Sequence, residues 1–165
     1  MEEAASRYIR VYTAARLLKW SIEQYREEKQ GPMLARAGSI FKRLTRGSFE
    51  KLNVDFHSEP LKLQAKRADG TLVAIDGLSE GTRDQLFLAL RLAALDMHLD
   101  QAHALPFIAH DLFINYDDKR SMEGLEALGE LSRKTQVVFL THHDHLLPVV
   151  RHVFGAEVNV VNLAS

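Results

Sequence analysis

The sequence lacks several features that would each indicate a particular class of protein. It has no cysteine, which excludes a disulfide framework. It has no signal peptide pattern and no apolar run of about 18 residues, the length that a membrane span needs. The formal net charge of −1 argues against broad adhesion of this chain to nucleic acid. We therefore expect a cytoplasmic globular protein with no membrane partner.

Composition supports a folded domain. Of the 165 residues 46% are hydrophobic and 26% are charged, which suffices for one domain with a substantial core. No internal repeat or low-complexity segment interrupts the chain. The helices and strands of the domain can therefore be predicted from the patterns of apolar residues along the chain.

Near the N-terminus, apolar residues recur in steps of three and four between Arg, Lys and Glu. This spacing is typical of a coiled-coil seam, but an ordinary amphipathic helix shows it too, so periodicity leaves both open. We expect Gly31-Pro32 to break this helix, because proline suits a first helical turn, and a second helix to run from about Pro32 to Leu44. The seam residues are Tyr8, Val11, Ala15, Leu18, Ile22 and Tyr25.

The segment from Phe49 to Ile75 alternates like β-structure, with a turn predicted at residues 68–71. We expect a small antiparallel sheet there, then helices at residues 121–131 and 144–154 and a closing strand at 158–163. The alternating residues are Leu52, Val54 and Phe56, and then Leu61, Leu63 and Ala65.

A Ser-x-Gly turn opens a long apolar helix in the segment LSEGTRDQLFLALRLAA, residues 78–94. The first N–H groups of a helix lack intrahelical partners and the macrodipole is positive there, so an anion binds favourably. Ser79 adds a hydroxyl donor and Gly81 allows close approach of the backbone. The segment predicts a buried helix whose start can hold phosphate, although a serine-capped core helix would have the same cap and apolar face.

Three later segments follow in a fixed order. The run LPFIAHDLF, residues 105–113, has the form of a buried parallel strand that delivers an acidic side chain to a ligand crevice. The tetrapeptide NYDD follows at residues 115–118, where Asp117 and Asp118 also suit a helix N-terminus. The run VVFLTH, residues 137–142, is a second strand pattern that ends in histidine.

These four segments, in this order, resemble the signature motif, Walker B strand, D-loop and switch-histidine loop of ATP-binding-cassette ATPases, in the SMC-like, YhaN-type branch linked to DNA maintenance. The resemblance implies an α/β fold: the C-terminal lobe of an ABC-type ATPase head, with a parallel-strand core, helices and a small antiparallel sheet. It implies a coiled-coil arm at residues 1–30 and the lobe at residues 31–165.

The phosphate-loop pattern G-x-x-x-x-G-K-[ST] does not occur in the sequence. In the family this loop lies in an N-terminal half, separated from the signature half by a long coil. The resemblance therefore implies that this chain is the C-terminal half, that an N-terminal Walker A half is its partner, and that the isolated chain is inactive. A second ATPase head and, through the full assembly, DNA are the further partners it implies.

The resemblance also implies two cofactors, ATP and Mg²⁺, and roles for particular residues. Asp111 occupies the position of the catalytic carboxylate, and His142 occupies the position of the histidine that contacts the γ-phosphate. The nucleotide contacts would act in trans, on ATP held by the opposite head, so ATP would join two heads and hydrolysis would release them. The residues implied for nucleotide binding are Ser79, Glu80, Gly81, Gln85 and Asp117.

One position departs from the family. The residue before the catalytic carboxylate should be the aspartate that serves Mg²⁺, but this chain has His110, and Mg²⁺ prefers oxygen ligands whereas imidazole suits softer metals. We expect weakened turnover with head engagement less affected. A hydrolysis-impaired module that senses ATP is the alternative function. A shifted register, with Asp111 as the metal ligand and Leu112 in the catalytic place, fits the D-loop spacing less well.

Three other interpretations stay open. His110-Asp111 occurs in HD phosphohydrolases, although those are mostly helical and this pair follows a strand pattern. His142, His143 and His145 could form a metal cluster, although the first two would point to opposite sides if the strand continued. A cluster of basic residues could bind DNA, or it could be an ordinary solvated face. Its residues are Lys42, Arg43, Arg46 and Lys51.

Overall fold

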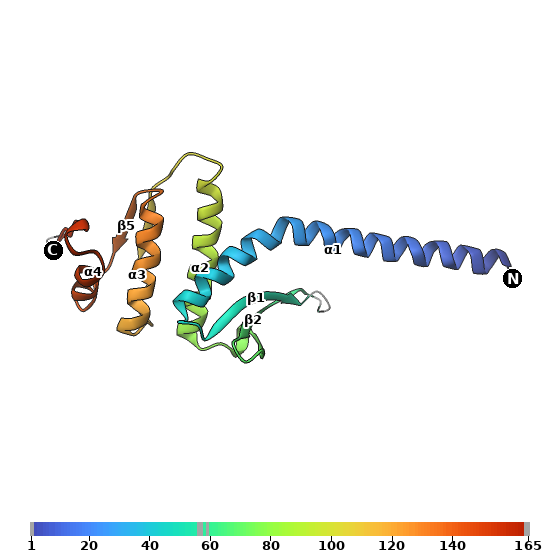
Figure 1. The fold of residues 1–165 in the computed structure, drawn as a ribbon, viewed down its shortest axis with the longest axis horizontal. Coiled ribbons are helices and arrows are strands. Elements are labelled where there is room, and N and C mark those ends of the chain that lie inside the picture. The colour runs from blue at the N-terminus through green and yellow to red at the C-terminus, as the bar shows by residue number, and fades with distance from the viewer. Residues whose placement is uncertain (1, 56–57, 59, 164–165) are drawn as a thin grey trace. The chain divides into compact units, whose positions relative to one another are not determined.

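The computed structural model describes residues 2–55, 58 and 60–163 (Figure 1). The chain forms two compact units, Met1–Met33 and Leu34–Ser165, which we describe separately. Among the described residues, none of the helices combines the length and apolar character needed to cross a membrane.

Helix α1 runs from Glu2 to Leu44 and includes Pro32, so the predicted break at Gly31-Pro32 is wrong. A proline inside a helix removes one N–H donor, but α1 continues through this position. In the first unit the seam side chains are exposed, from 42% at Ile22 to 69% at Tyr8.

The second unit is built around helix α2, Glu80–Leu99, whose predicted burial is confirmed. Leu86 and Ala89 are fully buried and belong to one apolar cluster. The last turns of α1 contribute Phe41 and Leu44 to the same cluster, and Phe113 enters it from the loop beyond the next strand. Burying each large side chain contributes about 1.5–3 kcal/mol, so the burial of α2 stabilises the second unit.

The predicted antiparallel sheet is confirmed. Strands β1 (Phe49–Asp55), β2 (Lys62–Arg67) and β3 (Leu72–Ala74) pair in that order, and Val54 lies opposite Leu63. The turn between β2 and β3 contains Gly70 at φ 88°, a conformation that glycine adopts without strain. A 3₁₀ turn, η1 (Ile75–Gly77), leads on to α2. Phe56, one of the predicted alternating residues, lies outside the described residues.

The second sheet is a parallel pair, β4 (Phe107–His110) and β5 (Val137–Leu140). Helix α3, Asp118–Ser132, connects the two strands, and α4, Leu146–Phe154, follows β5. Both helices were predicted, and each begins within a few residues of its predicted start. A second 3₁₀ turn, η2 (Gly155–Glu157), ends α4.

One face of the parallel pair is open. Ala109 in β4 is 1% exposed whereas its neighbour Ile108 is 65% exposed, so the prediction of a buried strand is wrong for the face that carries Ile108. Strands of parallel sheets are normally covered on both faces. The described elements cover one face of this pair only.

The predicted closing strand at residues 158–163 is also wrong, because these residues join neither sheet. A strand needs a neighbour with free backbone groups, and the described part of the chain provides none in register here. Val161 and Leu163 are 66% and 83% exposed.

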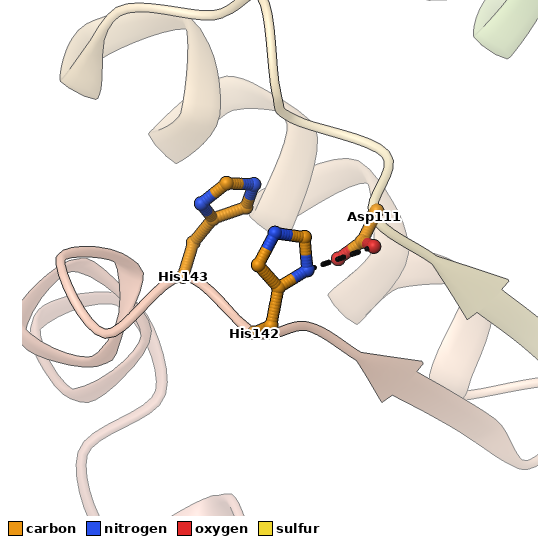
Figure 2. A group of neighbouring side chains, drawn as sticks. All are labelled: Asp111, His142 and His143. Atoms are coloured by element: carbon orange, nitrogen blue, oxygen red, sulfur yellow. Dashed lines mark hydrogen bonds and ion pairs between the residues drawn. The ribbon is translucent and has the colours of Figure 1, made fainter.

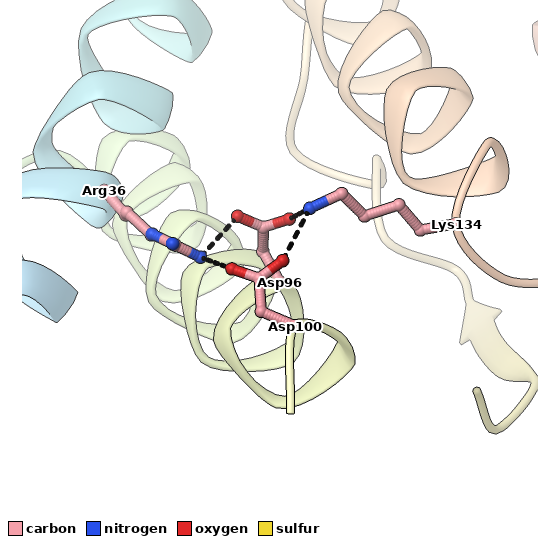
Figure 3. Close-up of polar contacts among 4 residues, drawn as sticks. All are labelled: Arg36, Asp96, Asp100 and Lys134. Carbon is pink, nitrogen blue, oxygen red and sulfur yellow. Dashed lines mark hydrogen bonds and ion pairs between the residues drawn. The ribbon is translucent and has the colours of Figure 1, made fainter. Parts of the chain in front are cut away.

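A charged network joins three elements of the second unit (Figure 3). Arg36 of α1 lies 2.8 Å from Asp96 and 2.8 Å from Asp100 at the end of α2, and Lys134, just after α3, contacts both carboxylates at 2.6 and 3.1 Å. Hydrogen bonds from Arg36 and Lys134 hold the pKa of Asp100 below its usual value. The network fixes the base of α1 to the far end of α2.

We expect Gly124→Ala to destabilise the second unit. A Cβ at Gly124 would lie 2.3 Å from Cε1 of the buried Phe113 ring, closer than real Cβ atoms come. Overpacking of this kind costs about 1–3 kcal/mol, and the gain in helix propensity offsets it only in part. Chemical denaturation would measure the change in the free energy of unfolding.

Gly31→Ala is the matched control, since it makes the same change inside a helix where, among the described residues, nothing beyond the helix's own backbone and the chain neighbours comes within 4 Å of the new methyl group. Its stability should be unchanged or slightly higher. Equal stability of the two variants would contradict the packing described here.

Candidate functional site

The start of α2 is open to solvent. Ser79 is its N-cap: Oγ accepts a hydrogen bond from the backbone N–H of Thr82 at 3.3 Å and shares another with the Thr82 hydroxyl at 2.8 Å. Ser79 and Glu80 are exposed, and Gly81 is partly buried. The positive end of the helix dipole and a hydroxyl group therefore face the surface together.

The loop before α3 packs on this helix start. A Cβ at Gly81 would lie 2.9 Å from the carbonyl oxygen of Asn115, and the Asn115 amide donates a 2.8 Å hydrogen bond to the Asp84 carboxylate. Asp117, at the end of the same loop, caps α3 by accepting from the backbone N–H of Arg120 at 2.8 Å. Gly81 thus fits the loop contact as well as close approach by a ligand. Asp84 and Asn115 form a link that the sequence analysis did not identify.

Asp111 lies directly after β4, in the left-handed region at φ 49°. Its backbone N–H donates to the Leu140 carbonyl at 3.0 Å, which aligns the ends of the two strands. The side chain is 12% exposed, and Oδ2 lies 3.0 Å from Nδ1 of His142 and 3.3 Å from Nδ1 of His110 (Figure 2 shows the first contact). Burial raises the pKa of Asp111, but the imidazoles of His110 and His142 outweigh it, so the pKa lies below the ordinary value.

His142 and His143 lie together, because the strand whose continuation would have turned them to opposite sides ends before them. Strand β5 ends at Leu140 and its alternation ends with it, while the backbone N–H of His143 donates to the Thr141 hydroxyl at 3.1 Å. The two ring centroids are 4.0 Å apart. Figure 2 shows both rings on the side of the loop that faces Asp111.

The predicted site residues therefore form two groups. The first, around the start of α2, contains Ser79, Glu80, Gly81 and Asp117, and the second, at the carboxyl ends of β4 and β5, contains His110, Asp111 and His142. A shallow depression extends between Asp111 and α2, where Asp84, Phe87 and Arg91 line it.

No protein-family model matches the chain. The uncharacterised protein YhaN of Bacillus subtilis (strain 168) is 26% identical over 147 residues, which cover 88% of this chain and 15% of YhaN. This chain thus spans less than a fifth of that relative.

Solved structures of SMC ATPase heads match at low identity. One, from work on ATP-driven dimerization and DNA-stimulated activation of SMC ATPases, has a TM-score of 0.59 and 17% identity, with 77% of this chain and 74% of that chain covered. The Smc head domain of Pyrococcus furiosus, with an extended coiled coil and bound to the C-terminal domain of ScpA, has a TM-score of 0.55 and 18% identity, covering 90% and 41%. This chain has an SMC-like head fold. We call residues 34–163 the SMC-like lobe.

Gln85 lies inside the SMC-like lobe. It is fully buried, and its amide donates a 2.7 Å hydrogen bond to the Leu44 carbonyl at the end of α1. The geometry gives no support to a direct contact with nucleotide. Gln85 lies four residues before Ala89 and so on the same buried face of α2. This spacing in the sequence predicts that Gln85 is buried.

The basic cluster is partly neutralised in the SMC-like lobe. Arg43 pairs with Glu130 of α3 at 2.6 Å, and Arg46 lies 3.9 Å from Glu123. Lys42 and Lys51 are exposed. This arrangement favours a solvated face held to α3 over a surface devoted to DNA.

We expect Gln85→Glu to destabilise the SMC-like lobe at neutral pH by about 3–5 kcal/mol, because it buries an unpaired charge and removes the donor to Leu44. The loss should shrink as pH falls below the raised pKa of the new carboxyl group, which can then donate a proton again. Denaturant titrations at several pH values would measure it.

Gln101→Glu, at an exposed position after α2, is the matched control and should change stability little. A Gln85→Glu variant as stable as this control at pH 7 would be incompatible with a structural role for Gln85.

Proposed function

We propose that this chain is the C-terminal lobe of an SMC-like ATPase head, which binds ATP at the interface of two heads once an N-terminal lobe supplies the phosphate loop. The observation that carries the proposal is the exposed N-terminus of α2, with Ser79 and Gly81, packed against the loop of Asn115 to Asp117. Asp111 and His142 lie at the carboxyl ends of adjacent parallel strands, where α/β proteins place their ligands.

The open sheet face supports the need for an N-terminal lobe. Ile108 and Leu140, on neighbouring strands, are 65% and 37% exposed. A two-stranded parallel sheet with one bare face is incomplete by the packing rules of such sheets. Further strands and helices from the N-terminal lobe would cover this face.

The start of α2 fits a phosphate group of ATP. An exposed helix N-terminus favours an anion through its dipole and free N–H groups, and the Ser79 hydroxyl can donate to a phosphate oxygen. In the proposed assembly this group engages ATP held by the opposite head, so ATP joins the heads. The similar SMC head comes from work on ATP-driven dimerization of SMC ATPases, which supports the joining of two heads by ATP.

The residues at Asp111 do not fit Mg²⁺. Mg²⁺ requires oxygen ligands in near-octahedral geometry, but the carboxylate of Asp111 faces imidazole nitrogens of His110 and His142 at 3.3 and 3.0 Å. The cluster as it stands therefore does not support a hydrolytic step through Mg²⁺. This donor set favours a second candidate function, an ATP-sensing head that engages a partner without efficient turnover.

The first unit fits a coiled-coil arm. Its seam from Tyr8 to Tyr25 exposes an apolar stripe, which a second helix could cover. The Smc head of Pyrococcus furiosus carries such a coil. In this proposal residues 1–30 are the arm, and movement of the heads changes its geometry while the full assembly engages DNA for maintenance or repair.

The test compares Ser79→Asp with Ser79→Asn in a head rebuilt with an N-terminal lobe that carries a phosphate loop. Aspartate and asparagine are nearly isosteric and both cap helices well, so the two variants should fold equally. Only aspartate places a negative charge against phosphate. We expect ATP-dependent dimerisation, measured by light scattering, to be at least about tenfold weaker in Ser79→Asp than in Ser79→Asn, which is about 1.4 kcal/mol.

Equal ATP-dependent dimerisation of the two variants would contradict contact between Ser79 and phosphate. No nucleotide response in a properly folded rebuilt head would overturn the assignment of the ATPase motifs as a whole.

The second candidate is tested by His110→Asp in the same rebuilt head, which restores an oxygen donor beside Asp111. Because Mg²⁺ prefers such a donor, we expect ATPase turnover to rise by about tenfold or more, while dimerisation changes little. His103→Asp, at an exposed position before β4, is the control for added charge. If His110→Asp raises turnover no more than this control does, His110 does not limit hydrolysis.

A further inference from the structure

The cluster at the ends of β4 and β5 has the composition and spacing of a metal site. One ligand atom from each of Asp111, His142 and His143 can be chosen so that all lie within 4.8 Å of one another. In a tetrahedral site with bonds of about 2.1 Å, ligand atoms are about 3.4 Å apart. The 3.0 Å separation between Asp111 Oδ2 and His142 Nδ1 is near this value, and the remaining ligand atom lies within 4.8 Å of both, so side-chain movement of an ångström or so would bring all three to one ion.

Two polar atoms of this cluster are buried and have no hydrogen-bond partner among the residues that the structure describes. They are Oδ1 of Asp111 and Nε2 of His143. A buried polar group without a partner costs about 1–3 kcal/mol, so structures retain such groups where a ligand satisfies them. Asp111 is in addition held in the left-handed backbone region that few residues adopt.

The donor set selects the class of cation. Two imidazoles and one carboxylate are ligands typical of Zn²⁺, which accepts four-coordinate geometry with nitrogen and oxygen donors. His110, whose side chain is 71% exposed and whose Nδ1 lies 3.3 Å from Asp111 Oδ2, is available as a fourth ligand. His145 lies further out, with its ring centroid 5.4 Å from that of His143.

We propose that Asp111, His142 and His143 bind a divalent cation of the Zn²⁺ class, which holds the ends of β4 and β5 together. The site is formed by this chain alone. It needs neither nucleotide nor an N-terminal lobe, so its test is independent of the test of the ATPase head.

The experiment is calorimetric titration of Zn²⁺ into the tag-free full chain, with melting temperature as a second readout. We expect one Zn²⁺ per chain, a higher melting temperature with Zn²⁺, and an isotherm that excess Mg²⁺ leaves unchanged. His143→Ala and His142→Ala should each weaken binding by at least about tenfold. The His142 side chain is 72% exposed, so its removal leaves the fold intact even if His143→Ala perturbs it.

His103→Ala is the matched control, because this exposed histidine precedes β4 whereas the cluster follows it. Its affinity for Zn²⁺ should equal that of the unaltered chain. The proposal is overturned by the absence of saturable Zn²⁺ binding, by binding that survives in folded His142→Ala or His143→Ala, or by displacement of Zn²⁺ by Mg²⁺.

Discussion

The burial of α2 is the constraint on which the rest of the SMC-like lobe depends. Its apolar face packs on the last turns of α1 and on Phe113, and Gln85 adds a buried hydrogen bond of 2.7 Å to the Leu44 carbonyl. Because the helix is held along its length, its N-terminus has a fixed position. The loop at Asn115 therefore meets a positioned helix start, where Gly81 packs against the Asn115 carbonyl and Asp84 accepts a hydrogen bond from the Asn115 amide.

The loop from Asp111 to Asp117 connects the two groups of candidate functional residues. It leaves β4 with Asp111 beside His142, sends Phe113 into the core, and reaches α2 through the Asn115–Asp84 hydrogen bond. Phe113 fits only because Gly124 of α3 has no side chain. The loop thus links both groups of candidate residues to the packing of α2 and α3.

The chain combines a well-packed interior with surfaces that its own described elements leave bare. The apolar stripe of the first unit and the outer face of β4 and β5 are both exposed, although each has the pattern of a buried surface. Burial of apolar area drives protein association, so both surfaces have the character of interfaces. This agrees with a chain that matches only 15% of the length of its relative YhaN.

The sequence by itself determined the features set by local periodicity and capping. Alternation at Leu52 and Val54, the turn at Gly70 and the Ser79 cap each depend on neighbours within a few residues, and all were predicted correctly. Tertiary structure decided the rest. Asp111 and His142 are 31 residues apart and meet because two strands pair, and His143 joins them because β5 ends at Leu140, before its alternation could turn His143 away. No local pattern encodes such contacts, since packing between distant segments sets them.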